Sequence, residues 1–408
     1  MLIIDYFKKL SFGKTKKLKI MRICPAPNNI NEFRNNNNLD KIDWLSQVKI
    51  MQNENIFIPG SWAKEMSSLG CIVFDTLYDD VSLAFSWANE NNYLKAYDQT
   101  NPLFEILLKQ VEIFKPDIII YWTGGLYKVD LSHRKYLRDI STNKIVFATV
   151  WGDEIPKDTN YNEYFKDIDI AFAVNNAYKD KFLENNINAV NFGSGFDEDI
   201  FNQKVTPIKN RKYNIIMSGD TGYLRPDHYN RYNILTKLIN EIDLKIYTTE
   251  PTAINLDTDN FFYNKKSLME LRPDKVNPSL LNGKDYYSLL NNSKIVLNIH
   301  RDECLDYGNL RCFEACGAGS LLLTDRSEEL NEFYVVETNI ENLNINKITA
   351  EVIGFTSIDD CIFKIKFLLS RPDLIERVTQ NAIKRTLKDH TVKKRALLMY
   401  EHFTKITF

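Results

Sequence analysis

The stretch NLRCFEACGAGSLLLTD, residues 309–325, joins a short helix pattern to an apolar strand pattern. Asn309 suits a helix N-cap, and Gly317 suits a left-handed helix end. We therefore expect a helix between these two residues, with Arg311 in its first turn and Glu314 near its last. Both charges oppose the helix dipole, and each destabilises the helix by about 0.3–1 kcal/mol. Their placement therefore requires a reason other than helix formation.

Two interpretations of Arg311 and Glu314 remain open. They lie three positions apart on one side of the helix, which is the spacing of a local ion pair. Alternatively, Glu314 accepts hydrogen bonds from a polyol such as ribose, because two carboxylate oxygens can hold two adjacent hydroxyl groups. Gly317 and Gly319 would then let a ligand or the backbone come close to the next strand. Asp306, eight positions before Glu314, adds a second carboxylate in the preceding loop.

The whole chain of 408 residues alternates apolar strand patterns with helical patterns. The strand patterns are near-continuous apolar runs, which is typical of parallel strands covered on both faces. We therefore predict an α/β fold with two units. We expect an N-terminal domain at 1–205, a C-terminal domain at 206–388, and a last helix within 389–408 that packs back on the N-terminal domain. Strands are predicted at residues 18–24, 71–76, 117–122, 145–150, 170–174, 189–192, 213–218, 244–248, 295–299 and 320–324.

Composition limits the classes of protein. The chain is 44% apolar and 26% charged, which indicates a soluble globular protein. A formal net charge of -2 favours no nucleic-acid partner. No apolar run approaches the ~18 residues of a membrane helix, and the N-terminus lacks the pattern of a signal peptide. Six cysteines without a metal-binding spacing favour reduced thiols. A cytoplasmic location is expected.

The segment KKLSFGKTKKLK, residues 8–19, carries six lysines and no acidic residue. One interpretation is a solvated chain terminus. The other is a weak peripheral contact between this basic N-terminus and anionic lipid at the inner face of the membrane.

Loops that follow the predicted strands are the expected ligand sites, because doubly wound sheets bind ligands at the carboxyl ends of their strands. In SGDTGYLR, residues 218–225, Gly219 permits close backbone approach and Arg225 offers a charge-assisted contact to a phosphate. The sequence lacks the G-K-[ST] ending of a P-loop. The loop is equally explained as a simple connection.

Two further strand-end loops carry candidate residues. Asp153 and Glu154 follow the strand predicted at 145–150, so we expect them at a strand-end ligand site. His300 follows the strand predicted at 295–299 and has either a structural role or a role in a cleft.

The segment from 286 to 325 resembles the C-terminal domain of retaining GT-B glycosyltransferases, and within them the CgeB-like, group 1 transferases. The matching residues form an Asn-x-Arg-x-Phe-Glu run, a glycine-bearing turn and an apolar strand that ends in Thr-Asp: Asn309, Arg311, Phe313, Glu314, Gly317, Gly319, Thr324 and Asp325. The resemblance extends over about 210–405 and partly over 115–205. It implies a GT-B architecture, with two Rossmann-like, doubly wound domains that face a central cleft.

The resemblance also implies roles for particular residues. Glu314 would bind the ribose of a nucleotide, and Asp306 would contact the donor sugar or support the reaction centre. Arg225 would contact the diphosphate. The family's companion lysine at that loop is missing, so Arg231 or Arg301 would substitute for it. The donor-binding set implied by the match is completed by Asn309, Arg311, Gly317, Gly219 and His300.

The implied reaction moves a sugar from a UDP- or GDP-sugar to an acceptor hydroxyl with retention of configuration, in surface glycan biosynthesis. Arg225, Asp306, Asp153 and Glu154 are the candidate catalytic residues, the last two on the acceptor side. The acceptor would be a glycan, a lipid-linked glycan or a protein, and no cofactor or metal is expected. Two alternatives stay open: a nucleotide-sugar 2-epimerase, and a non-catalytic protein that binds a nucleotide or glycan.

Overall fold

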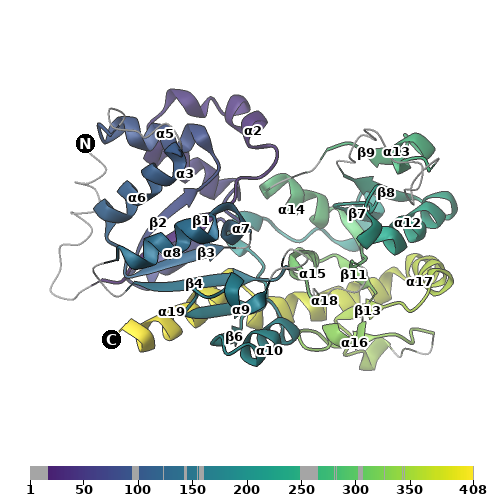
Figure 1. Cartoon of the computed structure of the whole chain (residues 1–408). Coiled ribbons are helices and arrows are strands. Elements are labelled where there is room, and N and C mark those ends of the chain that lie inside the picture. Colours follow the sequence, from purple (N-terminus) through teal and green to yellow (C-terminus); the bar gives the residue numbers. More distant parts are fainter. Residues whose placement is uncertain are drawn as a thin grey trace. The chain divides into compact units, whose positions relative to one another are not determined.

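The computed structural model describes residues 17–93, 101–122, 124–141, 145–153, 155, 160–248, 265–279, 281, 283–301, 307–325, 327–341, 343 and 345–407. The chain divides into two compact units. The first comprises residues 1–193 together with 392–408, and the second comprises residues 194–391. Each unit is built on one parallel β-sheet (Figure 1).

The first sheet has six described strands in the order β2-β1-β3-β4-β5-β6, and all neighbours pair in parallel. Every residue of β3 and β4 is buried, as expected for apolar strands covered on both faces. The strands are β1 (Lys19–Cys24), β2 (Ile72–Leu77), β3 (Ile118–Trp122), β4 (Val146–Trp151), β5 (Ile170–Ala173) and β6 (Ala189–Asn191).

Several helices of the first unit begin at an Asn or Asp whose side chain caps them. Asn101 caps α6 with its side chain, and Pro102 occupies the first turn, where its missing N–H is harmless. The helices are α2 (Ile30–Asn36), α3 (Trp44–Asn53), α4 (Trp62–Ser68), α5 (Val81–Glu90), α6 (Pro102–Phe114), α7 (Gly125–Lys128), α8 (Leu131–Asp139), α9 (Tyr161–Tyr164), α10 (Asn176–Glu184) and α19 (Val392–Thr407), with a 3-10 turn η1 (Leu39–Lys41).

The last helix, α19, belongs to the first unit although it follows the second in sequence (Figure 1). It packs against α4, and Phe403 on α19 meets Phe172 of β5 with ring centroids 5.4 Å apart. Val392, Ala396 and Met399 are also buried along this face. Their helical spacing explains why the chain returns to the first unit: α19 has an apolar stripe to cover.

The second sheet has seven described strands in the order β12-β13-β11-β10-β7-β8-β9, again all parallel. The strands are β7 (Tyr213–Ser218), β8 (Leu244–Tyr247), β9 (Val276–Asn277), β10 (Ser293–Asn298), β11 (Leu321–Thr324), β12 (Val336–Glu337) and β13 (Val352–Gly354). From β7 the chain moves to β8 on one side, and from β10 it moves to β11 on the other. The neighbouring ends of β7 and β10 therefore form the topological switch point, where such sheets bind ligands.

Helices of the second unit are α11 (Glu198–Phe201), α12 (Tyr229–Glu241), α13 (Leu268–Leu271), α14 (Gly283–Asn291), α15 (Leu310–Gly317), α16 (Ser327–Leu330), α17 (Ile358–Ser370) and α18 (Pro372–Asp389), with 3-10 turns η2 (Ile208–Asn210), η3 (Pro226–His228) and η4 (Ile345–Lys347). One side of the core joins apolar residues of α12, α17 and α18 to the central strands. This packing fixes the positions of the strand ends and therefore of the loops that follow them.

The sequence predictions of the α/β fold and its two parallel-sheet units are confirmed. All ten predicted strands are present, with ends shifted by at most two residues. The strands β9, β12 and β13, of two or three residues each, are not among these ten. The expected domain boundary at residue 205 lies inside the second unit. The chain enters that unit earlier because Phe196 forms a parallel bridge with Thr391.

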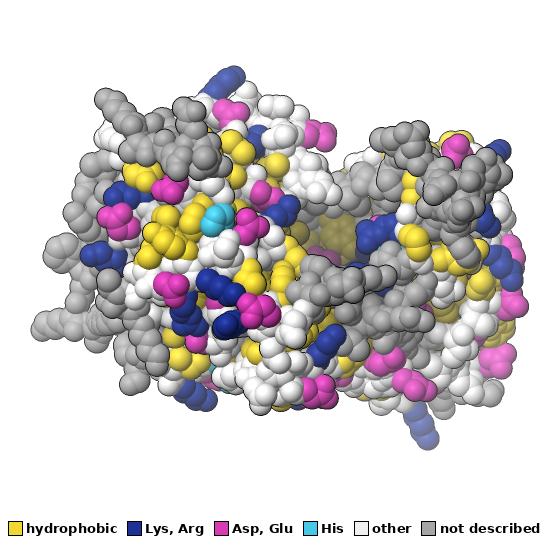
Figure 2. All heavy atoms as spheres, viewed as in Figure 1, with side chains coloured by type: hydrophobic (Ala, Val, Ile, Leu, Met, Phe, Trp, Pro, Cys, Tyr) yellow, Lys and Arg dark blue, Asp and Glu magenta, His cyan; other side chains and the backbone are white. Residues whose placement is uncertain are grey.

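The face of the molecule seen in Figure 2 mixes basic and acidic side chains over both units, without an extended patch of one sign among the described residues. Within the described residues, no helix combines the length and the apolar character that crossing a bilayer requires. The described ranges also contain no cluster of three or more His, Cys, Asp or Glu side chains suited to hold a metal ion.

Candidate functional site

Helix α15 carries the two charges that the sequence singled out. It begins after Asn309, as predicted, but the Asn309 side chain makes no capping hydrogen bond. The helix ends in a Schellman motif, in which Gly319 N–H donates to Cys316 at 3.2 Å and Ser320 N–H donates to Ala315 at 2.9 Å. The left-handed residue is Gly319, with φ of 83°, so the prediction of a left-handed Gly317 is wrong.

Gly317 has a packing role in the structure. A Cβ at this position would lie 2.3 Å from the ring of Phe196, so the aromatic ring occupies the space that a side chain would need. Phe196 is itself held by a hydrogen bond from its N–H to the His390 carbonyl at 2.8 Å. The expectation that Gly317 makes room for a ligand is therefore corrected: it makes room for Phe196.

Glu314 is only 6% exposed and lies beside two tyrosines of α14. The Tyr287 hydroxyl donates to its carboxylate. The same hydroxyl accepts from the Asp197 N–H at 3.1 Å. Burial raises the pKa of Glu314 to about 7, Arg311 opposes this rise, and the Asp197 charge adds to it. Because Tyr287 is the single hydrogen-bond donor to this buried carboxylate among the described residues, Glu314 keeps unused acceptor capacity for hydroxyl groups.

Arg311 and Glu314 form no direct ion pair among the described residues, although the charge of Arg311 acts to lower the pKa of Glu314. Its Nη1 instead donates to Asn298 Oδ1 at 2.7 Å. A Cβ on Gly219 would lie 2.5 Å from Arg311 Nη2, so the guanidinium lies directly against the Gly219 backbone. Gly219 has φ of 120° and follows β7. Arg311 is thus located at the switch point between β7 and β10.

His300 and Asp325 form a second polar pair at the strand ends. His300 Nδ1 lies 2.6 Å from Asp325 Oδ1, and the His300 N–H donates to both carboxylate oxygens at 3.1 Å. The other ring nitrogen, Nε2, lies 3.2 Å from Asn298 Nδ2. His300 is buried, so both of its nitrogens are committed to protein groups. This geometry fits a residue that holds the side chains of Asp325 and Asn298 in place.

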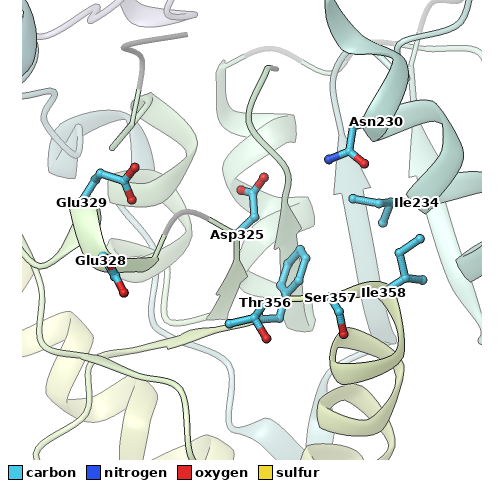
Figure 3. Close-up of a pocket in the computed structure, with 9 residues that line it drawn as sticks. Asn230, Ile234, Asp325, Glu328, Glu329, Thr356, Ser357 and Ile358 are labelled. Atoms are coloured by element: carbon cyan, nitrogen blue, oxygen red, sulfur yellow. The ribbon is translucent and has the colours of Figure 1, made fainter. Parts of the chain in front are cut away.

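A cavity of about 380 Å³ opens beside Asp325 (Figure 3). Its lining combines acidic and hydroxyl groups with apolar side chains from the loops after β11 and β13 and from α12: Asn230, Ile234, Asp325, Glu328, Glu329, Phe355, Thr356, Ser357 and Ile358. Asp325 connects this cavity to His300 and Asn298, and through them to Arg311. The carboxyl edge of the second sheet thus carries one continuous polar network.

Arg225 lies in the loop after β7, as predicted, and pairs with Asp220 at 3.1 Å. This carboxylate offsets much of its charge, and both side chains are partly exposed to solvent. Arg231 is buried and donates from Nη1 to the Asp220 carbonyl at 3.0 Å. Arg301 is half-buried just after β10.

Three other predicted residues lie in the first unit or outside the described ranges. Asp153 is half-buried in the first unit, just after β4. Glu154 and Asp306 lie outside the described residues. Asn298 and Tyr287 were not predicted as site residues, although both contact the predicted charges. The one available signal for Asn298 was a polar residue within an apolar run, at the end of a strand.

The comparisons with known proteins agree with this fold. Residues 233–401 match a family model described as "Glycosyl transferase-like". No curated protein matches the sequence. A glycosyltransferase from Rickettsia africae ESF-5 has 14% identity and a TM-score of 0.54, with 96% of this chain and 99% of that chain covered.

Two further solved structures were determined with a nucleotide sugar bound. HepE from Anabaena in complex with UDP-glucose has 11% identity and a TM-score of 0.55, with 95% of this chain and 100% of that chain covered. An alpha-glucosyltransferase in complex with UDP-glucose and DNA containing an abasic site has 13% identity and a TM-score of 0.55, with 95% and 100% covered. The fold is therefore that of the GT-B glycosyltransferases, and together with the family match it supports a glycosyltransferase.

Proposed function

We propose that the chain is a retaining glycosyltransferase whose second unit binds a UDP- or GDP-sugar, and that it acts in surface glycan biosynthesis. The observation that carries the donor site is the position of Glu314. It is a buried carboxylate with one hydrogen-bond donor, on a helix whose first turn presents Arg311 to the switch point of the sheet. A nucleotide needs both elements: an acceptor for ribose hydroxyls and a cation for phosphate.

Glu314 would hold the ribose through its free acceptor sites. Two ribose hydroxyls donating to the carboxylate would supply the hydrogen bonds that burial has removed. These bonds favour the ionised form, so the ligand would lower the raised pKa of Glu314. Glu314 is therefore a binding residue, and it takes no part in proton transfer to the acceptor.

The reaction would break the bond between the anomeric carbon and the phosphate oxygen, whose electron pair stays with the phosphate. The acceptor oxygen then bonds to the same face of the sugar, and its proton passes to the departing phosphate. Cations that stabilise the developing phosphate charge would provide the main catalytic effect, and loss of one such donor typically lowers the rate by about 10²–10³-fold. We propose Arg311 and Arg225 for this role, and Asp153 for the acceptor side.

The experiment is a thermal-shift screen with UDP and GDP on the wild type, on Glu314→Ala and on Glu376→Ala. Glu376 is an exposed residue of α18 in the same unit, so its variant is a matched control. At a hundredfold excess over Kd, a ligand stabilises by about 2.7 kcal/mol. The wild type and the control should show this stabilisation with one of the two nucleotides, and Glu314→Ala should lose it. Equal shifts in all three proteins would refute the ribose role.

Transfer itself is tested with the matching nucleotide sugar and a panel of glycan, lipid-linked and protein acceptors. An α-linked product from an α-linked donor would establish retention. Conversion of the donor without any acceptor would instead favour the epimerase alternative, and binding without turnover would favour a non-catalytic protein.

A further inference from the structure

Asn298 is the most connected polar side chain of the candidate site. It is the last residue of β10 and is fully buried. Its Oδ1 accepts from Arg311 Nη1 at 2.7 Å and from Asn309 Nδ2 at 3.2 Å. Its Nδ2 faces Thr324 Oγ1 at 3.2 Å and His300 Nε2 at 3.2 Å. One amide therefore joins β10, the first turn of α15 and the end of β11.

The hydrogen-bond partners of Arg311 are neutral: the Asn298 amide and the Tyr286 hydroxyl. Among the described residues, no carboxylate lies within salt-bridge distance of its guanidinium, whereas Arg225 pairs with Asp220. The Nε of Arg311 is buried and has no hydrogen-bond partner in the described part of the chain. A half-buried guanidinium with neutral hydrogen-bond partners stays positively charged and keeps an unused donor. Both properties suit an anionic ligand.

The direction of the guanidinium is fixed from two sides. Asn298 holds Nη1 at the end of β10, while Nη2 lies over Gly219 at the end of β7. These two strands are neighbours, and their ends form the switch point of the sheet. Any side chain at position 219 would displace Arg311 from this location. The amide of Asn298 and the lack of a side chain at Gly219 thus together set the position of the Arg311 guanidinium.

We propose that Arg311 is the principal ligand for the diphosphate, and that Asn298 is the positioning residue that orients it without neutralising its charge. This inference rests on the proposed function for the identity of the ligand, because it names the group that the nucleotide presents to α15. It assigns the role of the missing family lysine to an arginine of the helix, in place of a cation in the loop after β7. Arg225 then becomes an outer, partly compensated cation.

The test replaces Asn298 by aspartate, which keeps the shape and adds one negative charge 2.7 Å from Arg311. Affinities for UDP and uridine, and for GDP and guanosine, are measured by titration calorimetry on the wild type, Asn298→Asp and Asn298→Ala. Asn214→Asp is the matched control, because Asn214 is exposed in β7 and lies towards the opposite end of the same sheet. A thermal-shift series with pyrophosphate alone completes the design.

Asn298→Asp should weaken binding of the cognate nucleoside diphosphate by at least about tenfold and leave the affinity for its nucleoside within about twofold. Asn298→Ala should lie between the wild type and Asn298→Asp, and the control should match the wild type. A purely structural role would lower both affinities together. Such a parallel loss, or an undiminished diphosphate affinity in Asn298→Asp, would overturn the proposal.

The pyrophosphate series separates this inference from the proposed function. If no nucleotide binds the wild type, the proposed function fails. Stabilisation by pyrophosphate that Asn298→Asp abolishes would still support an anion site at Arg311. Absence of any pyrophosphate effect, together with absence of nucleotide binding, would overturn both. If Asn298→Asp does not fold, Asn298→Ala decides through the same ratio of diphosphate to nucleoside affinity.

Discussion

Glu314→Gln is the perturbation that most directly tests the burial of the site. The pKa of Glu314 is raised from its ordinary value of 4.5 to about 7, because burial disfavours the charged carboxylate. The folded protein therefore binds this proton more tightly than the unfolded chain. The stabilisation is fully present below pH 4.5 and is lost as the pH rises through about 7. Glutamine keeps the shape of the protonated acid and cannot ionise, so the variant loses this dependence.

The expected magnitude follows from the pKa values of the unfolded and folded states. A tenfold difference in proton affinity corresponds to about 1.4 kcal/mol, so the full change across the titration is about 3 kcal/mol. Between about pH 5.5 and about pH 8.5, the Glu314 contribution to the free energy of unfolding should fall by about 2 kcal/mol. Glu314→Gln should therefore gain about 2 kcal/mol relative to the wild type over this interval. Other titrating groups cancel in the comparison.

The assay is urea unfolding of both proteins at the two pH values, without ligand, followed by fluorescence and circular dichroism. Glu376→Gln is the control, because its carboxylate is exposed. A stability difference between wild type and Glu314→Gln that stays constant with pH would refute the reasoning. A change of the opposite sign, in which the wild type gains stability relative to Glu314→Gln as the pH rises, would do so as well, because it would mean that the folded protein favours the ionised carboxylate.

Three further predictions concern helix α15 and the residues around it. Binding of the cognate nucleoside diphosphate near pH 6.5 should release protons, because ribose hydroxyls favour ionised Glu314; calorimetry in buffers of different ionisation enthalpy measures this, and proton uptake would contradict it. Gly317→Ala should destabilise the second unit by about 1–3 kcal/mol in urea unfolding, because its Cβ would overlap the Phe196 ring; an unchanged midpoint would contradict that contact. Gly219→Ala should weaken diphosphate binding more than nucleoside binding, because its Cβ would lie 2.5 Å from Arg311 Nη2; an equal loss of both affinities would argue against a role specific to the anion.

Local sequence contained most of the information on the fold. The strands of both sheets are apolar runs that need burial on two faces, so their periodicity and their parallel pairing were predictable together. The start of α15 after Asn309 was equally local. Its end was not, because Gly317 was predicted to be left-handed and Gly319 takes that conformation instead. The Phe196 ring, from far away in the sequence, lies where a side chain at position 317 would be.

The candidate site was predictable only where its residues share one segment. Glu314 and Arg311 were identified because their charges conflict with the helix dipole. Asn298 was missed because its partners come from β10, α15 and β11, and only the parallel pairing of the strands brings them together. Arg225 differs, because its partner Asp220 lies in the same loop, but the sequence did not show that the two side chains pair. Sequence indicated which charges are unusual, whereas the structure shows which of them are balanced.

The central claim is that Glu314 binds the ribose of a nucleotide donor. The most direct test is a cycle of affinities that compares the cognate nucleoside diphosphate with its 2′,3′-dideoxy analogue, on the wild type and on Glu314→Ala. Because hydrogen bonds to a charged group are strong, the wild type should prefer the ribose form by at least about tenfold, and the variant should show almost no preference. The same preference in both proteins would contradict the claim.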